Sequence, residues 1–179
     1  MSDKTNAKPP FSEDIDSSIN IKKGGSGEEP SAPRPAATVL LVRAPLNEVE
    51  VFMIQRNAKT NFGNAWVFPG GKLDEVDGID EANDYCFGLS DEMASQILGL
   101  KKGGLNYWVA CIRECFEECG VLLAYRENGD LLDDPSKDEM TILDRYRDLL
   151  NQGEPVLYQL CKEMNLSLIH ISEPTRQSL

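Results

Sequence analysis

The clearest pattern of apolar and polar positions is helical and lies in the segment "LNYWVACIRECFEECG", residues 105–120. A helix turns by about 100° per residue, so side chains three and four positions apart share a face. The apolar face predicted in this way consists of Trp108, Val109, Ile112, Cys115, Phe116 and Cys119. Gly120 is a natural end for this helix. We therefore predict a helix with one buried face and one charged face.

Strand-like patterns precede this helix. The run "AATVLLVRAP" (36–45) is continuously apolar and β-branched, and "EVEVFMIQR" (48–56) follows after a short connection. Two such runs this close together predict a β-hairpin. A further short strand is expected at 66–68, ending in the Pro-Gly-Gly turn of "WVFPGGK".

Further elements are predicted on either side of the long helix. The segment "SDEMASQILGL" (90–100) has the pattern of a short helix, with Ser90 as its N-cap. After the long helix, "VLLAYRENGD" (121–130) predicts a strand and a turn. Two more segments with helical periodicity follow at 138–153 and 154–165, with Gly153 and Pro155 between them.

The two ends of the chain differ from its middle in their pattern of residues. Residues 1–35 are rich in proline, glycine and acidic residues, and we expect them to be a disordered tail. The segment "LSLIHISEPTR" (166–176) back-translates to a string that resembles a transposase adapter used in short-read library preparation. We therefore expect 166–179 to be an artefact. The domain at 36–165 would then lack a C-terminal portion, and this chain would be less active than the full-length protein. His170, the only histidine, lies in this segment, so we assign it no function.

Composition narrows the class of protein. The 179 residues suit one domain, and no apolar run has the length of about 20 residues that a membrane span needs. A net charge of −12 disfavours nucleic acid as a partner, because phosphate attracts basic surfaces. Five cysteines without a secretory signal predict reduced thiols in an intracellular protein. Cys111, Cys115 and Cys119 are spaced by four, which matches no zinc knuckle.

The charged face of the long helix carries candidate chemistry. Arg113, Glu114, Glu117 and Glu118 fall within an arc of about 140° on the same helical projection. The three carboxylates converge, and Arg113 can hold Glu117, four residues on, by a charge-assisted hydrogen bond. Such a set suits Mg²⁺ or Mn²⁺, which prefer oxygen ligands. The alternative is a solvated acidic helix face, which binds no ion.

The glycines of "WVFPGGK" and this charged face together resemble the Nudix box, G-x5-E-x7-R-E-U-x-E-E-x-G-U, where U is apolar. The second half matches at every fixed position, from Arg113 to Val121. The first half matches at Gly71, but Asp77 stands where glutamate is expected. Between Asp77 and Arg113 lie 35 residues instead of seven, which indicates an insertion of 28 at about 78–105.

This resemblance extends over about 36–165 and implies a fold and a subgroup. The expanded box, the "FPGG" and "GVLL" segments and the later helices are similar to an insertion-bearing Nudix subgroup that includes peroxisomal coenzyme-A diphosphatases. The arginine spacing that helps mark coenzyme-A hydrolases is only partly present, since Arg56 is followed four residues later by Thr60. The implied fold class is α/β, a Nudix-type α/β/α sandwich with a mixed sheet.

The resemblance also implies roles for single residues. The implied metal ligands are Glu114, Glu117, Glu118 and the backbone carbonyl of Gly71. The implied catalytic residues are Arg113, which would orient Glu117, and Glu114, which would be a further ligand or would activate water. The implied supporting residues are Gly70, Asp77 and Gly120. No substrate-binding residue is indicated.

The reaction implied by the resemblance is metal-dependent cleavage of a pyrophosphate bond. For coenzyme A or acyl-coenzyme A, the products would be 3′,5′-ADP and (acyl-)phosphopantetheine. One alternative is a Nudix hydrolase of ADP-ribose, nucleotide sugars or dinucleotides, and another is a non-catalytic metal- or nucleotide-binding module. The expected partner is a small nucleotide-type substrate, and the resemblance is compatible with peroxisomes or mitochondria. The sequence indicates no oligomeric state.

Overall fold

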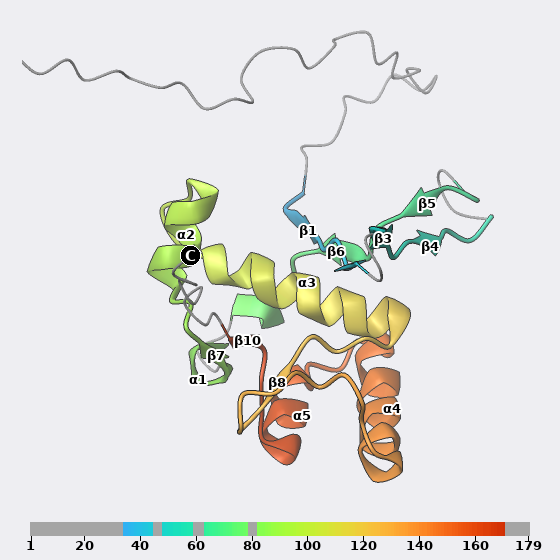
Figure 1. The fold of residues 1–179 in the computed structure, drawn as a ribbon. Coiled ribbons are helices and arrows are strands. Elements are labelled where there is room, and N and C mark those ends of the chain that lie inside the picture. The colour runs from blue at the N-terminus through green and yellow to red at the C-terminus, as the bar shows by residue number, and fades with distance from the viewer. Residues whose placement is uncertain (1–33, 45–47, 59–62, 79–81, 171–179) are drawn as a thin grey trace, which may run out of the picture. The chain divides into compact units, whose positions relative to one another are not determined.

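The computed structural model describes residues 34–44, 48–58, 63–78 and 82–170. The predicted disordered tail (1–35) therefore lies outside the described residues except for its last two, and 171–179 lie outside them as well. Along the described chain, six short strands come first, and helices with further short strands between and after them follow (Figure 1). The predicted mixed α/β class is confirmed.

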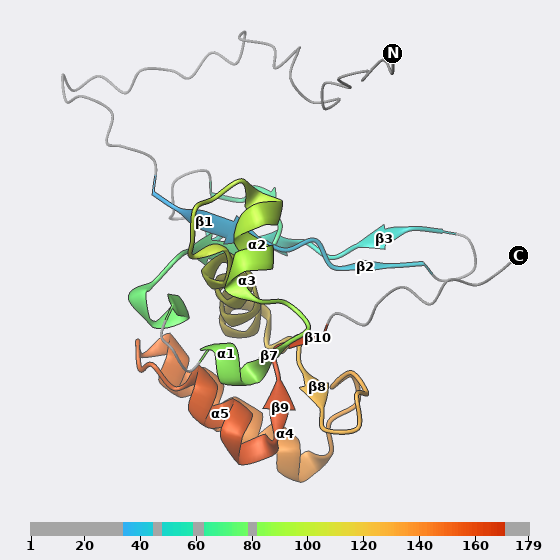
Figure 2. The same cartoon turned by 90° about the vertical axis from the view of Figure 1, so that its left-hand side faces the viewer.

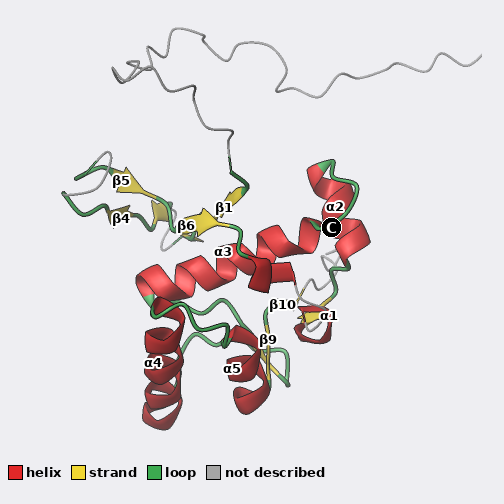
Figure 3. Cartoon of the chain, turned by 180° about the vertical axis from the view of Figure 1, so that it is seen from behind, coloured by secondary structure: helices red, strands yellow, loops and turns green. Residues whose placement is uncertain are grey.

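The helices account for most of the regular structure (Figure 3). They are α1 (Ala82–Tyr85), α2 (Asp91–Leu98), α3 (Gly104–Cys119), α4 (Lys137–Asn151) and α5 (Leu157–Met164), with a 3₁₀ turn η2 at Glu75–Gly78. The four helices that the sequence predicts are all present. The helix α1 and the turn η2 were not predicted.

The ends of three helices have specific causes. The hydroxyl of Ser90 accepts a hydrogen bond from the backbone N–H of Met93 at 3.2 Å, which confirms it as the N-cap of α2. Gly120 ends α3 in the left-handed conformation, with φ of 73°. At α4, Ser136 and Glu139 form a reciprocal capping box that the sequence analysis missed.

The strands are short and pair two by two within the described residues. They are β1 (Ala36–Thr38), β2 (Val42–Arg43), β3 (Glu50–Val51), β4 (Ile54–Gln55), β5 (Trp66–Val67), β6 (Gly70–Lys72), β7 (Cys86–Phe87), β8 (Tyr125–Arg126), β9 (Leu166–Ser167) and β10 (Ile169–His170). The pairs are β1–β6, β2–β3, β4–β5 and β8–β9, all antiparallel, and the parallel pair β7–β10. The predicted hairpin is confirmed by β2 and β3 (Figure 2).

One local prediction was wrong. The segment 70–72 is not a turn but strand β6, whose Gly71 lies opposite Ala37 of β1. Glycine suits this strand because a Cβ at Gly70, where φ is 151°, would collide with the backbone of β1. After α3, the predicted strand and turn within 121–130 are confirmed, with β8 at 125–126 and a turn directly after it.

A buried core unites the inner faces of the helices. The apolar face predicted for α3 is largely confirmed, with Val109, Ile112, Cys115 and Phe116 buried, while Trp108 and Cys119 are only partly buried. Against it lie the buried residues Leu143, Tyr146 and Leu150 of α4 and Leu157, Tyr158, Leu160 and Cys161 of α5. Each large apolar side chain buried in this way contributes roughly 1.5–3 kcal/mol to folding.

The segment predicted to be adapter-derived is partly described. Its residues Leu166 and Ser167 form β9, which pairs with β8, and β10 pairs with β7. Leu166, Leu168 and Ile169 are buried in the core. The origin of 166–179 stays a prediction. In the described part of the chain, every helix is too short or too polar to cross a membrane.

Candidate functional site

The guanidinium of Arg113 is the centre of the site, and it is only 4% exposed. Its Nε donates to Asp77 Oδ1 at 2.8 Å, and its Nη2 donates to Asp77 Oδ2 at 3.1 Å and to the carbonyl of Lys72 at 3.0 Å. Its Nη1 donates to Glu114 Oε1 at 3.1 Å and to Glu117 Oε1 at 3.2 Å. The bond between Arg113 and Glu117 is the one that their spacing predicts. A single arginine therefore links β6, η2 and α3.

Asp77 joins the two halves of the Nudix-like pattern across the insertion. Its side chain is buried, although 35 residues separate it from Arg113 in sequence. Its Oδ2 also accepts a hydrogen bond from the backbone N–H of Asp74 at 2.7 Å, which fixes the turn η2. The bidentate pair with Arg113 is the strong, geometrically specific kind of charged hydrogen bond. Asp77 therefore supports Arg113 directly, in the position where the pattern expects glutamate.

The glycines of β6 lie against the glutamates of α3. The backbone N–H of Gly70 donates to Glu118 Oε2 at 3.1 Å. A Cβ at Gly71 would overlap the carboxyl group of Glu114, so glycine leaves room for that carboxyl in its present position. The carboxylates of α3 are therefore positioned by backbone as well as by Arg113.

The pKa values of the site residues reflect the crowding of their charges. Burial raises the pKa of the Glu114 carboxyl; the positive charge of Arg113 opposes the rise, and Glu117 and Glu118 add to it. Burial also raises the pKa of Glu117, again against the effect of Arg113. For Arg113, burial alone would lower the pKa, but its bonds with Asp77 and the nearby glutamates outweigh burial and raise it. The site thus holds more negative charge than Arg113 compensates.

These residues have the chemistry of a divalent cation site. Carboxylate oxygens and a backbone carbonyl are the donors that Mg²⁺ and Mn²⁺ prefer, and a cation would offset the excess negative charge. Within the described ranges, however, no three acidic, cysteine or histidine side chains form a ready-made metal cluster. Arg113 and Gly70 engage the carboxylates instead. The ligand roles therefore stay predictions.

The structure brings nearly all the predicted site residues together. Those in one connected region are Gly70, Gly71, Asp77, Arg113, Glu114, Glu117 and Glu118. Gly120 instead serves as the end of α3. Sequence reasoning missed the carbonyl of Lys72 and the carboxylate of Asp74, 3.5 Å from Arg113. For Asp74, the available signal was its spacing of three residues from Asp77 in "LDEVD", whereas no pattern in the sequence indicates the Lys72 carbonyl.

An apolar cavity of about 700 Å³ borders α3 on the side next to the charged face. From α3 it is lined by Tyr107, Trp108, Cys111 and Ile112. Its other walls come from residues 36–40, which include β1, and from residues near β8 and β10. The cavity offers a place for an apolar group, although none of the candidate-site residues lines it.

The chain is similar to known proteins at the level of family and of one curated relative. A family model described as the NUDIX domain matches residues 32–159. Among curated proteins, an acyl-coenzyme A diphosphatase, NUDT19, from Xenopus laevis is 27% identical over 144 residues. That match covers 66% of this chain, and the chain spans only 38% of that relative's length. No solved structure matches the chain significantly.

Proposed function

The chain belongs to the Nudix family, and from this premise we propose that it acts as a metal-dependent diphosphohydrolase that cleaves a pyrophosphate bond. The observation that carries the proposal is the network around Arg113. This network joins Asp77 and β6 to Glu114 and Glu117 in spite of the insertion. A surface acidic helix would need neither a buried arginine nor glycines fitted to its glutamates.

The proposed roles follow from these contacts. Arg113 holds the carboxylate of Glu117 in one orientation, and the N–H of Gly70 holds that of Glu118. Glu114, Glu117, Glu118 and the carbonyl of Gly71 would hold Mg²⁺ or Mn²⁺. A bound cation would neutralise pyrophosphate charge and lower the pKa of the attacking water. Glu114, whose pKa is raised, is suited to accept that water's proton if it is not itself a ligand.

For the substrate, we propose coenzyme A or acyl-coenzyme A. Water would add to one phosphorus of the pyrophosphate, and the bond from that phosphorus to the bridging oxygen would break, giving 3′,5′-ADP and (acyl-)phosphopantetheine. Two observations support this choice: the Xenopus laevis relative is an acyl-coenzyme A diphosphatase, and an apolar cavity lies beside α3. ADP-ribose, nucleotide sugars and dinucleotides are the alternative substrates.

The test is a hydrolysis screen of the 179-residue chain with Mg²⁺ or Mn²⁺. The substrates are coenzyme A, a medium-chain acyl-coenzyme A, ADP-ribose and a dinucleoside polyphosphate, with products identified by mass spectrometry. We expect 3′,5′-ADP from the coenzyme-A substrates, and no product when the cation is chelated. Glu118→Gln should abolish turnover without unfolding the protein, whereas Glu92→Gln, at an exposed position of α2, should not.

Other results of this screen would support a different substrate, a different function or a different site. Faster hydrolysis of ADP-ribose or of a dinucleotide would replace the proposed substrate with that class. Mn²⁺ binding without hydrolysis of any substrate would favour the non-catalytic metal- or nucleotide-binding module. Equal turnover by Glu118→Gln and the unmodified chain would show that the site is wrongly assigned.

A further inference from the structure

The N-terminus of α3 is capped by another helix. Its own N-cap residue, Gly103, has no side chain to offer, and no side-chain cap is formed there. Instead Asp91 Oδ2 accepts from the N–H of Gly103 at 3.0 Å and Asp91 Oδ1 accepts from that of Leu105 at 3.0 Å. The hydroxyl of Ser95 accepts from the N–H of Gly104 at 2.9 Å. Three backbone donors at this end of α3 are thus satisfied by α2.

This contact between α2 and α3 is close and charged. A Cβ at Gly104 would overlap the backbone of Ala94 and Ser95, both of which are buried. The hydrogen bonds from Gly103 and Leu105 lower the pKa of Asp91, so its carboxyl is ionised at neutral pH. A negative charge at a helix N-terminus is also favoured by the helix dipole. Because α2 lies within 78–105, these bonds come from the insertion.

The C-terminus of α3 is held in a corresponding way by α4. Arg147 Nε donates to the backbone carbonyl of Glu117 at 3.0 Å, and its Nη2 donates to that of Glu118 at 3.1 Å. Carbonyls in the last turn of a helix lack partners within the helix, and a positive charge there is favourable. The two carbonyls belong to residues whose carboxylates lie in the candidate site, where Glu117 contacts Arg113 and Glu118 contacts Gly70 of β6.

We propose that Asp91 and Ser95 at one end and Arg147 at the other clamp α3 along its axis and are positioning residues for Glu114, Glu117 and Glu118. In this view the insertion is part of the catalytic scaffold, because it supplies the N-terminal clamp. The catalytic meaning of the clamps rests on the proposed diphosphohydrolase function. The clamps act through the backbone of α3 and contact no substrate.

Axial position matters because the glutamates must match a fixed strand. A helix rises 1.5 Å per residue, so a small slide of α3 changes which backbone atoms of β6 its side chains meet. The hydrogen bond from Gly70 to Glu118 and the close fit of Glu114 against Gly71 both depend on that position. Displacements of about 1 Å in an active site can cost a hundredfold in rate.

The experiment uses three variants and two matched controls in the full 179-residue chain. The variants are Asp91→Asn, Arg147→Ala and the conservative Arg147→Lys. The control for Asp91→Asn is Ser90→Ala, which removes the N-cap of α2. The control for the Arg147 variants is Arg145→Ala. Arg145 lies two residues before Arg147, and this change removes its exposed pair with Glu163. For each protein, three properties are measured: the Mn²⁺ dissociation constant from the electron paramagnetic resonance signal of free Mn²⁺, turnover of coenzyme A, and backbone amide exchange.

We expect Arg147→Ala to weaken Mn²⁺ binding by about tenfold, as losses of residues that orient metal ligands commonly do. Arg147→Lys should recover part of this loss, and Arg145→Ala should leave Mn²⁺ affinity unchanged, because its pair with Glu163 is exposed and lies outside the candidate site. Asp91→Asn should weaken Mn²⁺ binding and speed amide exchange at Gly103, Gly104 and Leu105, whereas Ser90→Ala should alter exchange in α2 alone.

Two results would overturn the proposal while leaving the proposed function intact. One is an active chain in which Arg147→Ala and Arg145→Ala have the same Mn²⁺ affinity and turnover. The other is unchanged amide exchange at 103–105 in Asp91→Asn. A chain that neither binds Mn²⁺ nor hydrolyses any substrate would instead contradict the proposed function, and the positioning role would fail with it.

Discussion

Two regions of the molecule pair arginine with carboxylates in opposite ways. Around Arg113 the guanidinium is 4% exposed and contacts Asp77, Glu114 and Glu117. Between α4 and α5, Arg145 pairs with Glu163 at 2.7 Å, but its side chain is 55% exposed. The distances are similar, whereas the surroundings differ. Burial, and not the presence of an ion pair, distinguishes the candidate site from the surface.

The difference has an energetic basis. Water competes for exposed charges and screens them, so a pair such as Arg145 and Glu163 contributes little to stability. A buried charge that loses its partner has no water to replace it, so removing one member of a buried pair is strongly destabilising. The Arg113 region should therefore be far more sensitive to substitution than the α4–α5 surface.

The largest effect is expected for Arg113→Met, which leaves the buried carboxylate of Asp77 without its partner. We expect a loss of about 3–5 kcal/mol in the free energy of unfolding, measured by urea denaturation. Arg145→Met, the matched change at the exposed pair, should change stability little. Equal losses of unfolding free energy in the two variants would show that burial does not distinguish the Arg113 region from the Arg145 pair.

A slightly smaller effect is expected for Asp77→Asn, which keeps the shape of the side chain and removes its charge. We expect a loss of about 3 kcal/mol, because Arg113 keeps its burial and loses its main counter-charge. Asp74→Asn is the control, since Asp74 lies 3.5 Å from Arg113 but its side chain is 64% exposed. An Asp74→Asn variant as unstable as Asp77→Asn would contradict the importance of burial.

Gly71→Ala tests the contact between β6 and α3. The added methyl group would overlap the Glu114 carboxyl, which ends a flexible side chain and can move away, so we expect a small loss of stability and a lower turnover number in a coenzyme A hydrolysis assay. Gly129→Ala strains a loop glycine with φ of 85° that has open space around it. That control should lose some stability and keep its turnover, and loss of turnover in both variants would weaken the assignment of Gly71.

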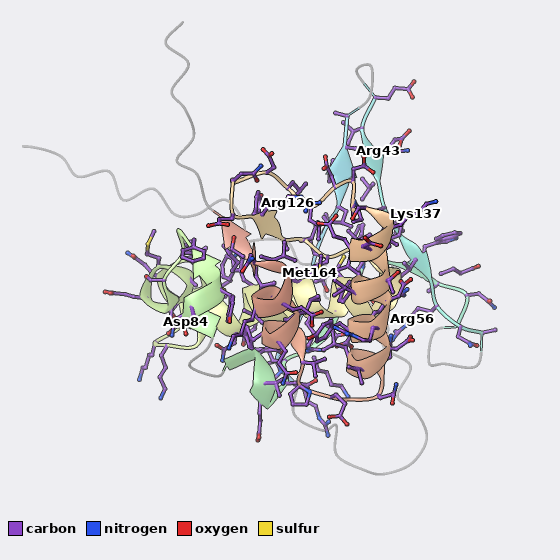
Figure 4. The ribbon with its side chains drawn as sticks, turned by 90° about the horizontal axis from the view of Figure 1, so that it is seen from below. Arg43, Arg56, Asp84, Arg126, Lys137 and Met164 are labelled. Carbon is purple, nitrogen blue, oxygen red and sulfur yellow. The ribbon has the colours of Figure 1, made fainter. Side chains whose placement is uncertain are left out.

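The smallest effect concerns Glu139 in the first turn of α4, which pairs with Arg126 of β8. Figure 4 labels Arg126 and Lys137, the first residue of α4. The hydrogen bonds from Arg126, then those at Ser136, lower the pKa of Glu139 to about 2. A lowered pKa means that Glu139 adds stability at neutral pH and that this contribution disappears between the ordinary glutamate pKa and about 2. In acid titrations followed by circular dichroism, Glu139→Gln should flatten this part of the stability curve. An unchanged curve would contradict the pairing.

Sequence patterns predicted the helices better than the strands, for a physical reason. The face of α3 repeats over four turns, and Ser90 and Gly120 mark helix ends by local chemistry. Strand β6 depends on its partner β1, and no local pattern distinguishes it from a Pro-Gly-Gly turn. Pairing partners distant in sequence are set by tertiary contacts, which a single sequence does not display.

The same limit applies to the candidate site. Charged residues within one helix could be placed on one face from their spacing alone, and the bond from Arg113 to Glu117 follows from it. The position of Asp77 came from the resemblance to the Nudix pattern, and its bidentate contact only from the structure. The residues Asp91, Ser95 and Arg147 carry no local signal, because their partners are backbone groups of another helix.

The hydrogen bonds of Arg113 also bear on how a substrate is recognised. A guanidinium has five N–H donors, and the contacts to Asp77, Lys72, Glu114 and Glu117 match that number. None is left to turn toward a phosphate. A nucleotide that approaches this site without a cation would thus meet like charge, so we expect nucleotide and cation to bind together rather than in independent steps.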